Sequence, residues 1–297
     1  MSNKPRKMTL EKKHNLTGWA FLAPATFLIA VFSFWPMIKA LVLSFQTGKG
    51  RNMQMAGFTN YIRMFQDDVF IQSIKNTFFY FIIQVPIMLV VALVLACILN
   101  KKDLRFKGFF RTMIFLPCTT SLVAYSIIFR SLFANDGLVN YVLVNLGILD
   151  KPYNFLTQPF AAKMVILLGL LWRWTGYNMV FFLSGLQNIE YSVYEAAKID
   201  GASAIQTFFK ITVPLLKPTI LLTAIMSTNG TLQLFDESIN LTDGGPANAS
   251  ISMSHYIYNL CFKYVPNFGY AAAMSFFILL LVAVLAFIQM RVGDKRD

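Results

Sequence analysis

Charged side chains are scarce in this sequence. Asp, Glu, Lys and Arg together make up 13% of the 297 residues, whereas about a quarter is usual for a soluble domain. Hydrophobic residues reach 56%, and Phe alone contributes 29 positions. These proportions exclude an ordinary soluble domain and indicate a membrane protein.

Histidine and cysteine are also rare. The two histidines, His14 and His255, stand far apart, and neither the H-E-x-x-H pattern nor the G-x-x-x-x-G-K-[ST] phosphate loop occurs. The three cysteines, Cys97, Cys118 and Cys261, are too widely spaced to suggest a disulfide framework or a metal cluster. We therefore expect no catalytic residues, no metal site and no cofactor in this chain, and any chemical energy must come from another subunit.

Long apolar runs are what the sequence has in abundance. An α-helix needs about 20 apolar residues to cross the hydrocarbon core, and such windows recur six times. A backbone exposed to lipid must satisfy its own hydrogen bonds, so each run is expected to be helical. Residues 1–15 are too polar to begin a cleavable signal peptide. The predicted fold is all-α, a polytopic membrane bundle with six transmembrane helices near 19–43, 78–99, 113–133, 161–183, 215–235 and 270–290.

The loops differ in positive charge, which sets the expected orientation. With the N-terminus inside, sixteen of the 26 Lys and Arg residues fall in inner segments and five in outer loops. This predicts a multi-pass protein of the cell membrane with cytoplasmic tails at 1–16 and 291–297 around a transmembrane domain at 17–290. The net charge of +12 is accounted for by this topology and the anionic inner leaflet, so no nucleic-acid partner is expected.

One polar segment separates the fourth and fifth predicted spans, on the cytoplasmic side. It contains EAAKIDGASAIQTFFKITVPLLKP, residues 195–218. The pattern predicts a helix over 191–199, an interruption at Gly201, and a second short helix over 202–213 with Asp200 as its N-cap. Pro214 and Pro218 mark the turn into the next span.

Two interpretations of this segment are open from periodicity alone. It is either an amphipathic loop on the inner membrane surface, with Glu195 and Lys198 as a weak exposed pair, or a docking surface for another protein. Periodicity slightly favours the first. The small residues around Glu195, which are Ala196, Ala197, Gly201 and Ala202, favour the second, because they permit close approach beside a charge.

A resemblance decides between them. EAAKIDGA, followed by Phe208, Ile211, Pro214 and Pro218, resembles the EAA motif in permease subunits of binding-protein-dependent ABC importers. The resemblance covers nearly the whole chain and is strongest to the carbohydrate-uptake branch, the maltose and glycerol-phosphate type permeases. Its further segments are FLAPATFLIAVFSFWPMIKALVLSF, FTNYIRMFQD, NTFFYFIIQVPIMLVVALVLACILN, FFRTMIFLPCTTS and LTDGGPANAS.

The resemblance implies a type I ABC importer permease-like fold in its shorter six-helix form. The additional hairpin and large outer domain of the eight-helix maltose-type subunit are missing from this sequence. By resemblance, the partners are a second homologous permease, two cytoplasmic ATPase subunits that bind ATP and Mg, an extracellular solute-binding protein, membrane lipid and a sugar, with an oligosaccharide favoured. It assigns the segment 191–218 to ATPase coupling, through Glu195, Ala196, Ala197, Asp200 and Gly201.

The substrate path must use polar and aromatic groups inside the bundle, since such groups are costly in lipid. Two stretches qualify, LWRWTGYN at 171–178 and STNGTLQLFDE at 227–237, and they flank the polar segment. Aromatic platforms beside amide and carboxylate acceptors suit sugars. The candidate residues are Trp172, Arg173, Trp174, Tyr177, Asn178, Asn229, Thr231, Gln233 and Asp236.

Arg173 is the most unusual of these, because it lies deep within a predicted span. An internal ion pair with Asp236 or Glu237 is the favoured interpretation, and a gate or substrate contact is the alternative. A secondary transporter or channel driven by an ion gradient would also use buried charges, but it would not explain the polar segment. The outer loop 241–250, with a turn at Gly244, Gly245 and Pro246, is expected to cap the cavity or to meet the binding protein.

Overall fold

The computed structural model describes residues 9–49, 52–101 and 103–293. The outermost parts of the two predicted tails, 1–8 and 294–297, lie outside the described residues. The helices are α1 (Leu10–Ile29), α2 (Trp35–Ser44), α3 (Thr59–Met64), α4 (Asp68–Leu99), α5 (Lys107–Thr119), α6 (Leu122–Leu132), α7 (Leu138–Asn145), α8 (Pro159–Gln187), α9 (Tyr191–Ile199), α10 (Ala204–Thr207), α11 (Val213–Leu215), α12 (Lys217–Leu232), α13 (Met253–Tyr258) and α14 (Phe268–Gly293). Short π-helical turns cover Ala30–Phe34, Phe208–Thr212, Ser238–Thr242 and Asn259–Lys263.

Six apolar helical segments have the length and composition to cross a membrane, if each bent pair is one span. Four are long helical stretches, at Leu10–Ser44, Asp68–Leu99, Pro159–Gln187 and Phe268–Gly293. The other two are broken. The pair α5 and α6 bends by 99°, and the pair Ala204–Leu215 and Lys217–Leu232 bends by 69°. The predicted helical bundle is confirmed, but the continuous helix expected over 113–133 is wrong, because the chain turns sharply at Thr120 and Ser121.

The polar segment 191–218 folds into two short helices that meet at a glycine. The helix predicted over 191–199 is α9, and Gly201 follows it with a φ of 74°. The amide of Ala202 donates to the Ala197 carbonyl and that of Gly201 to the Lys198 carbonyl, the pattern of a Schellman C-cap. The N-cap prediction for Asp200 is wrong, because α10 begins two residues after Ala202.

Ser203 caps that second helix instead. Its side chain accepts from the Gln206 amide at 3.3 Å, and the Gln206 side chain accepts from the Ser203 amide at 2.8 Å. This reciprocal capping box satisfies the backbone amides of both Ser203 and Gln206. Asp200 lies three residues before Ser203 and takes no part in it.

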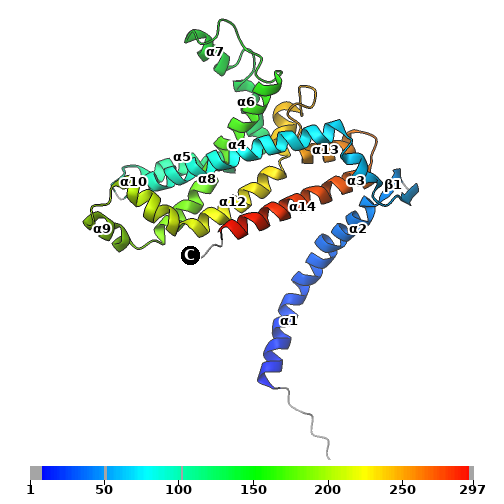
Figure 1. Cartoon of the computed structure of the whole chain (residues 1–297), viewed down its shortest axis with the longest axis horizontal. Coiled ribbons are helices and arrows are strands. Elements are labelled where there is room, and N and C mark those ends of the chain that lie inside the picture. Colours follow the sequence, from blue (N-terminus) through cyan, green and yellow to red (C-terminus); the bar gives the residue numbers. More distant parts are fainter. Residues whose placement is uncertain (1–8, 50–51, 102, 294–297) are drawn as a thin grey trace, which may run out of the picture.

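The bundle is built around α4 and α8, which pack along each other, with α12 against α4 and α14 (Figure 1). One hydrophobic cluster joins the second half of α4 to the second half of α8 through residues such as Ala92, Ala96 and Phe182. Another joins α3, α13 and α14. Gly176 lets α5 approach α8, because a Cβ there would collide with the Ile114 carbonyl.

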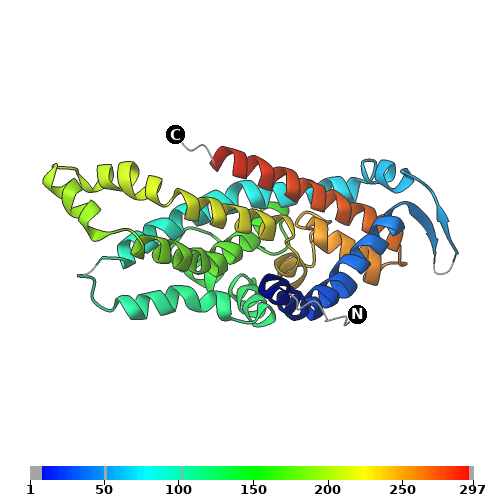
Figure 2. The same cartoon turned by 90° about the horizontal axis from the view of Figure 1, so that it is seen from below.

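The two ends of the bundle differ. The helices α9 and α10 project at one end, whereas the antiparallel hairpin β1 (Gln46–Lys49) and β2 (Asn52–Met55) lies at the other, as both views show (Figures 1 and 2). The sequence did not predict this hairpin. Near it, Asp67 caps α4 and accepts hydrogen bonds from Tyr256 at 2.6 Å and Tyr270 at 2.7 Å, which ties three helices together.

The first half of the first span, α1, stands apart from the rest of the chain, whereas the second half, α2, packs against α14. The span begins at Leu10, inside the segment predicted as a tail, and α1 points away from the bundle (Figure 1). None of its most apolar window is buried within the chain. Large side chains along it, among them Trp19, Phe21 and Phe32, are 70–83% exposed. The α1 half, with so little intrachain packing, has its surface available to lipid or to another protein.

Candidate functional site

A cavity of about 530 Å³ lies between α4, α8, α12 and the turn that follows α12. We call it the polar cavity. Six of the nine residues predicted for the substrate path line it: Trp174, Tyr177, Asn178, Thr231, Gln233 and Asp236. Two stretches whose nearest ends, Asn178 and Ser227, are 49 positions apart in the sequence therefore do meet at one site.

Helix geometry explains which of the predicted residues of α8 face the cavity. Positions 174, 177 and 178 are related by the three- and four-residue spacing that puts side chains on one helix face. Trp172 and Arg173 point elsewhere. The Trp172 ring packs against Tyr125 at 6.1 Å and Phe129 at 5.5 Å between ring centroids. Neither residue lines the polar cavity.

Asn229 does not line the cavity either, but it touches a residue that does. Its side-chain oxygen accepts a hydrogen bond from the Gln233 amide, and Asn229 itself is exposed. Because the two residues are one helical turn apart, Asn229 orients the Gln233 side chain rather than reaching the cavity.

A hydrogen-bond network holds the cavity wall together across three helices. Thr231 on α12 donates to the Gln84 side chain on α4 at 2.6 Å, and Ser227 donates to the Asn178 side chain at 3.2 Å. The Asn178 amide donates to the Trp174 carbonyl at 3.0 Å. Sequence reasoning missed Gln84 and Ser227. The signal for Gln84 was present, since it is an amide inside the otherwise apolar run FFYFIIQVPIML.

Aromatic and acidic groups share this wall. Trp174 and Tyr177 form an edge-to-face pair at 5.8 Å between ring centroids, and Phe235, in the turn after α12, also lines the cavity. Asp236 and the buried Glu237 supply carboxylates beside these rings. Flat apolar faces next to hydrogen-bond acceptors are the chemistry that binds the C–H faces and hydroxyl edges of sugars.

Arg173 is buried but forms no ion pair with either acid in the part of the chain that the structure describes. Its guanidinium donates instead to the Thr120 carbonyl at 2.8 Å and the Cys118 carbonyl at 3.4 Å. These carbonyls lie where α5 ends at the 99° bend, and the last carbonyls of a helix lack partners within it. The predicted ion pair is therefore wrong: the bend provides acceptors that the sequence pattern did not reveal.

Replacing Arg173 should therefore loosen the bend between α5 and α6. Arg173→Leu is expected to lower the free energy of unfolding by roughly 1–3 kcal/mol, because it leaves carbonyls without donors. Thermal unfolding of the detergent-solubilised protein measures this. Asp236→Asn is the matched variant and should leave the unfolding temperature unchanged. Equal destabilisation by both variants would restore the ion-pair interpretation.

The polar segment presents an exposed surface at the end of the bundle. Glu195, Ala196, Asp200 and Gly201 are exposed, and Ala197 is buried against the chain. Apolar side chains accompany them: Ile199, Ile205 and Phe209 are 65–86% exposed. A charged residue amid small and exposed apolar residues is the composition of a protein contact rather than of a solvated loop.

The loop 241–250, which the charge distribution predicts on the outer side, is held in place by contacts within its own chain. Asn76 on α4 donates to the Asn248 carbonyl at 3.1 Å and to the Ile251 carbonyl at 2.9 Å. Lys263 pairs with Asp243 at 2.9 Å, and the Gly245–Pro246 bond is cis. The loop is thus a fixed turn with exposed charges.

Residues 68–296 match the family described as the inner membrane component of binding-protein-dependent transport systems. The chain belongs to this family. Over 292 residues this permease is 51% identical to the lactose transport system permease protein LacF of Rhizobium radiobacter, covering 98% of both chains. It is 33% identical to the multiple sugar-binding transport system permease protein MsmF of Streptococcus mutans, covering 97% of this chain and 99% of that one.

Solved structures agree with this assignment of the fold. The permease superposes with a TM-score of 0.85 on a chain of a bacterial ABC transporter involved in alginate import, at 23% identity, covering 97% of this chain and 98% of that one. A chain of the alginate transporter in complex with its alginate pentasaccharide-bound periplasmic protein gives 0.84 at 25% identity, covering 96% of both. The family consists of transport components, so the permease is not itself an enzyme.

Proposed function

We propose that this permease is the membrane-spanning subunit of an ATP-driven sugar importer, that it forms half of the translocation path, and that it accepts oligosaccharides. The observation that carries the proposal is the polar cavity, where Trp174, Tyr177 and Asp236 meet amides within the bundle. The relatives support it, since their names specify lactose, arabinooligosaccharide and multiple-sugar transport. No observation favours transport driven by an ion gradient.

The polar segment is the proposed contact with the ATPase. It follows α8 after three residues and leads into α12, and these two helices supply half of the residues that line the polar cavity. Movement of α9 by a docked ATPase would therefore be transmitted by rigid helices to the residues that bind substrate. Glu195 provides the charge for an ion pair, and Gly201 permits close packing. ATP and Mg belong to the ATPase subunits.

A second, homologous permease is the proposed partner in the membrane. The exposed first span supports this partner, because α1 contributes almost nothing to the packing of its own chain. An extracellular solute-binding protein would deliver the sugar on the side opposite the polar segment. The excess of Lys and Arg in the polar segment, the termini and the α4–α5 turn supports cytoplasmic placement of both termini.

Reconstitution tests the proposal directly. The complex purified through this chain, in vesicles with the solute-binding protein outside, should accumulate labelled lactose or a labelled arabino-oligosaccharide when ATP and Mg are enclosed. A sodium or proton gradient without ATP should give no accumulation. Uptake driven by the gradient alone would identify a secondary transporter and overturn the proposal.

A further inference from the structure

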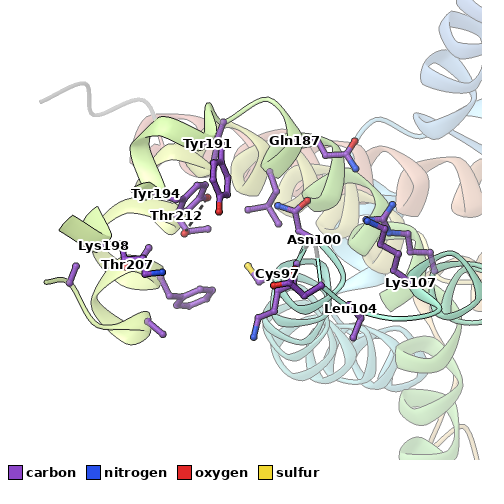
Figure 3. Close-up of a pocket in the computed structure, with 18 residues that line it drawn as sticks. Cys97, Asn100, Leu104, Lys107, Gln187, Tyr191, Tyr194, Lys198, Thr207 and Thr212 are labelled. Carbon is purple, nitrogen blue, oxygen red and sulfur yellow. Dashed lines mark hydrogen bonds between the residues drawn. The ribbon is translucent and has the colours of Figure 1, made fainter. Parts of the chain in front are cut away.

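A second cavity, of about 960 Å³, lies at the end of the bundle beside the polar segment. Figure 3 shows Tyr194, Lys198 and Thr207 on one side of it, facing Asn100 and Lys107 on the other. It is open between α9, the turn joining α4 to α5, and the end of α8. We call it the basic pocket.

The basic pocket is placed at the level of lipid headgroups. The spanning helices α4 and α8 end at Leu99 and Gln187, and the broken span begins with α5 at Lys107. Residues next to these three ends line the pocket. Since the ends of apolar spans mark the edge of the hydrocarbon core, the pocket lies in the headgroup region of the leaflet that faces the polar segment.

Its charge is strongly unbalanced. Among the described lining residues, four are basic, namely Lys101, Lys107, Arg111 and Lys198, and one, Asp103, is acidic. Within the described ranges no salt bridge joins Asp103 to any of the four. The described lining therefore has a net positive charge, and no ion pair within the described residues neutralises it.

Arg111 is fixed in position for binding. Its terminal nitrogen donates to the Leu99 carbonyl at 2.7 Å, which anchors the guanidinium at the end of α4. Arg111 lines the pocket and is only half-buried, and an anionic oxygen is the group that a guanidinium binds most strongly.

The neighbouring surface is suited to lipid rather than to water. Phe106, Phe109 and Phe110 surround Lys107 in the sequence and are 77%, 59% and 44% exposed. Lys107 and Arg111, one turn apart, share the helix face that lines the pocket. An aromatic face next to a basic face at a membrane surface is the pattern of an interfacial helix that contacts anionic lipid.

We propose that the basic pocket binds the phosphate headgroup of an anionic phospholipid of the leaflet next to the polar segment. The placement in the inner leaflet rests on the proposed function. Lys198 comes from α9, whereas Lys101, Lys107 and Arg111 come from the α4–α5 region. A bound headgroup thus bridges the polar segment to the bundle and restrains the element proposed to contact the ATPase.

Lipid retention by the purified complex tests this proposal. The complex is placed in nanodiscs of phosphatidylcholine with a small fraction of photo-crosslinkable phosphatidylglycerol, and labelled lipid on this chain is measured. In Lys101→Gln/Lys107→Gln both changed residues are exposed, so folding is preserved. The apparent affinity for phosphatidylglycerol should fall about fivefold per charge, hence about 25-fold for the two charges. Lys210→Gln, an exposed lysine of the polar segment outside the pocket, is the matched control and should retain wild-type labelling.

The outcomes separate the possible occupants. Displacement of the labelled lipid by millimolar glycerol phosphate would show that the pocket recognises the phosphate itself. If glycerol phosphate does not displace the lipid, the lipid tails also contribute to binding. Both results support the site. Equal labelling of the double variant and the wild type would overturn it. If the double variant labels normally but loses the ATPase, the proposal is also overturned, because the pocket would then bind a protein partner rather than a lipid. The assay needs neither sugar nor ATP, so failure of the transport proposal would not affect it.

Discussion

Gly201→Leu is expected to reduce sugar uptake to background and to release the ATPase from the purified complex. Gly201 has a φ of 74°, which costs a residue with a Cβ about 1–2 kcal/mol. A Cβ at this position meets nothing within 4 Å in the chain itself. The chain should therefore fold with modest strain, and the larger loss should come from a bulky side chain placed between Glu195 and the docked ATPase. Uptake into vesicles and ATPase co-purification measure the two effects.

Gly57→Leu is the matched control for this experiment. Gly57 has a φ of 56°, also with nothing within 4 Å of a Cβ, and it lies beside the β1–β2 hairpin at the far end of the bundle. Both variants should lose similar unfolding free energy, but Gly57→Leu should keep its ATPase. If both variants lose the ATPase to a similar extent, the effect is due to backbone strain. If Gly201→Leu takes up sugar normally, the polar segment does not couple the permease to the ATPase.

The second large effect is expected at the polar cavity. Trp174→Ala should raise the KM of sugar uptake more than tenfold, because the loss of a central Trp contact costs about 2 kcal/mol or more in binding. The Trp174 ring faces the cavity and is paired edge to face with Tyr177. The measurement is initial uptake of labelled sugar over a range of concentrations, with the amount of complex in the membrane determined in parallel.

Trp172→Ala, two residues away on the same helix, is the appropriate comparison. The Trp172 ring packs on Tyr125 and Phe129 outside the cavity. This variant should lower the unfolding temperature and leave the KM of the remaining complex unchanged. If both variants raise the KM equally, the cavity is not the sugar site; if only Trp172→Ala does, the path runs along the other face of α8.

Local sequence properties predicted a large part of this architecture. The six apolar segments were recognised because hydrophobic length alone is enough to identify a span. The helix over 191–199 and the break at Gly201 were recognised because a glycine after a helix readily takes a positive φ. The acidic and small residues of the polar segment needed no tertiary structure to be identified as a surface, and the resemblance then gave that surface a role.

Other features depended on contacts between distant segments. The bend at Thr120 and Ser121 exposes carbonyls that attract Arg173 away from the carboxylates it was expected to pair with. Gln84 became part of the polar cavity wall only because α4 packs beside α12. Periodicity places Trp172 and Trp174 on different faces of one helix, but the neighbouring helices determine which face borders the cavity.

The sequence by itself determined that the chain crosses a membrane with six apolar segments and carries a polar segment between two of them, because hydrophobicity, charge and glycine conformation act over a few residues. Only the tertiary structure decided which polar side chains meet, where Arg173 finds its acceptors, and that four basic residues surround one pocket. These outcomes depend on packing between helices that are distant in the sequence.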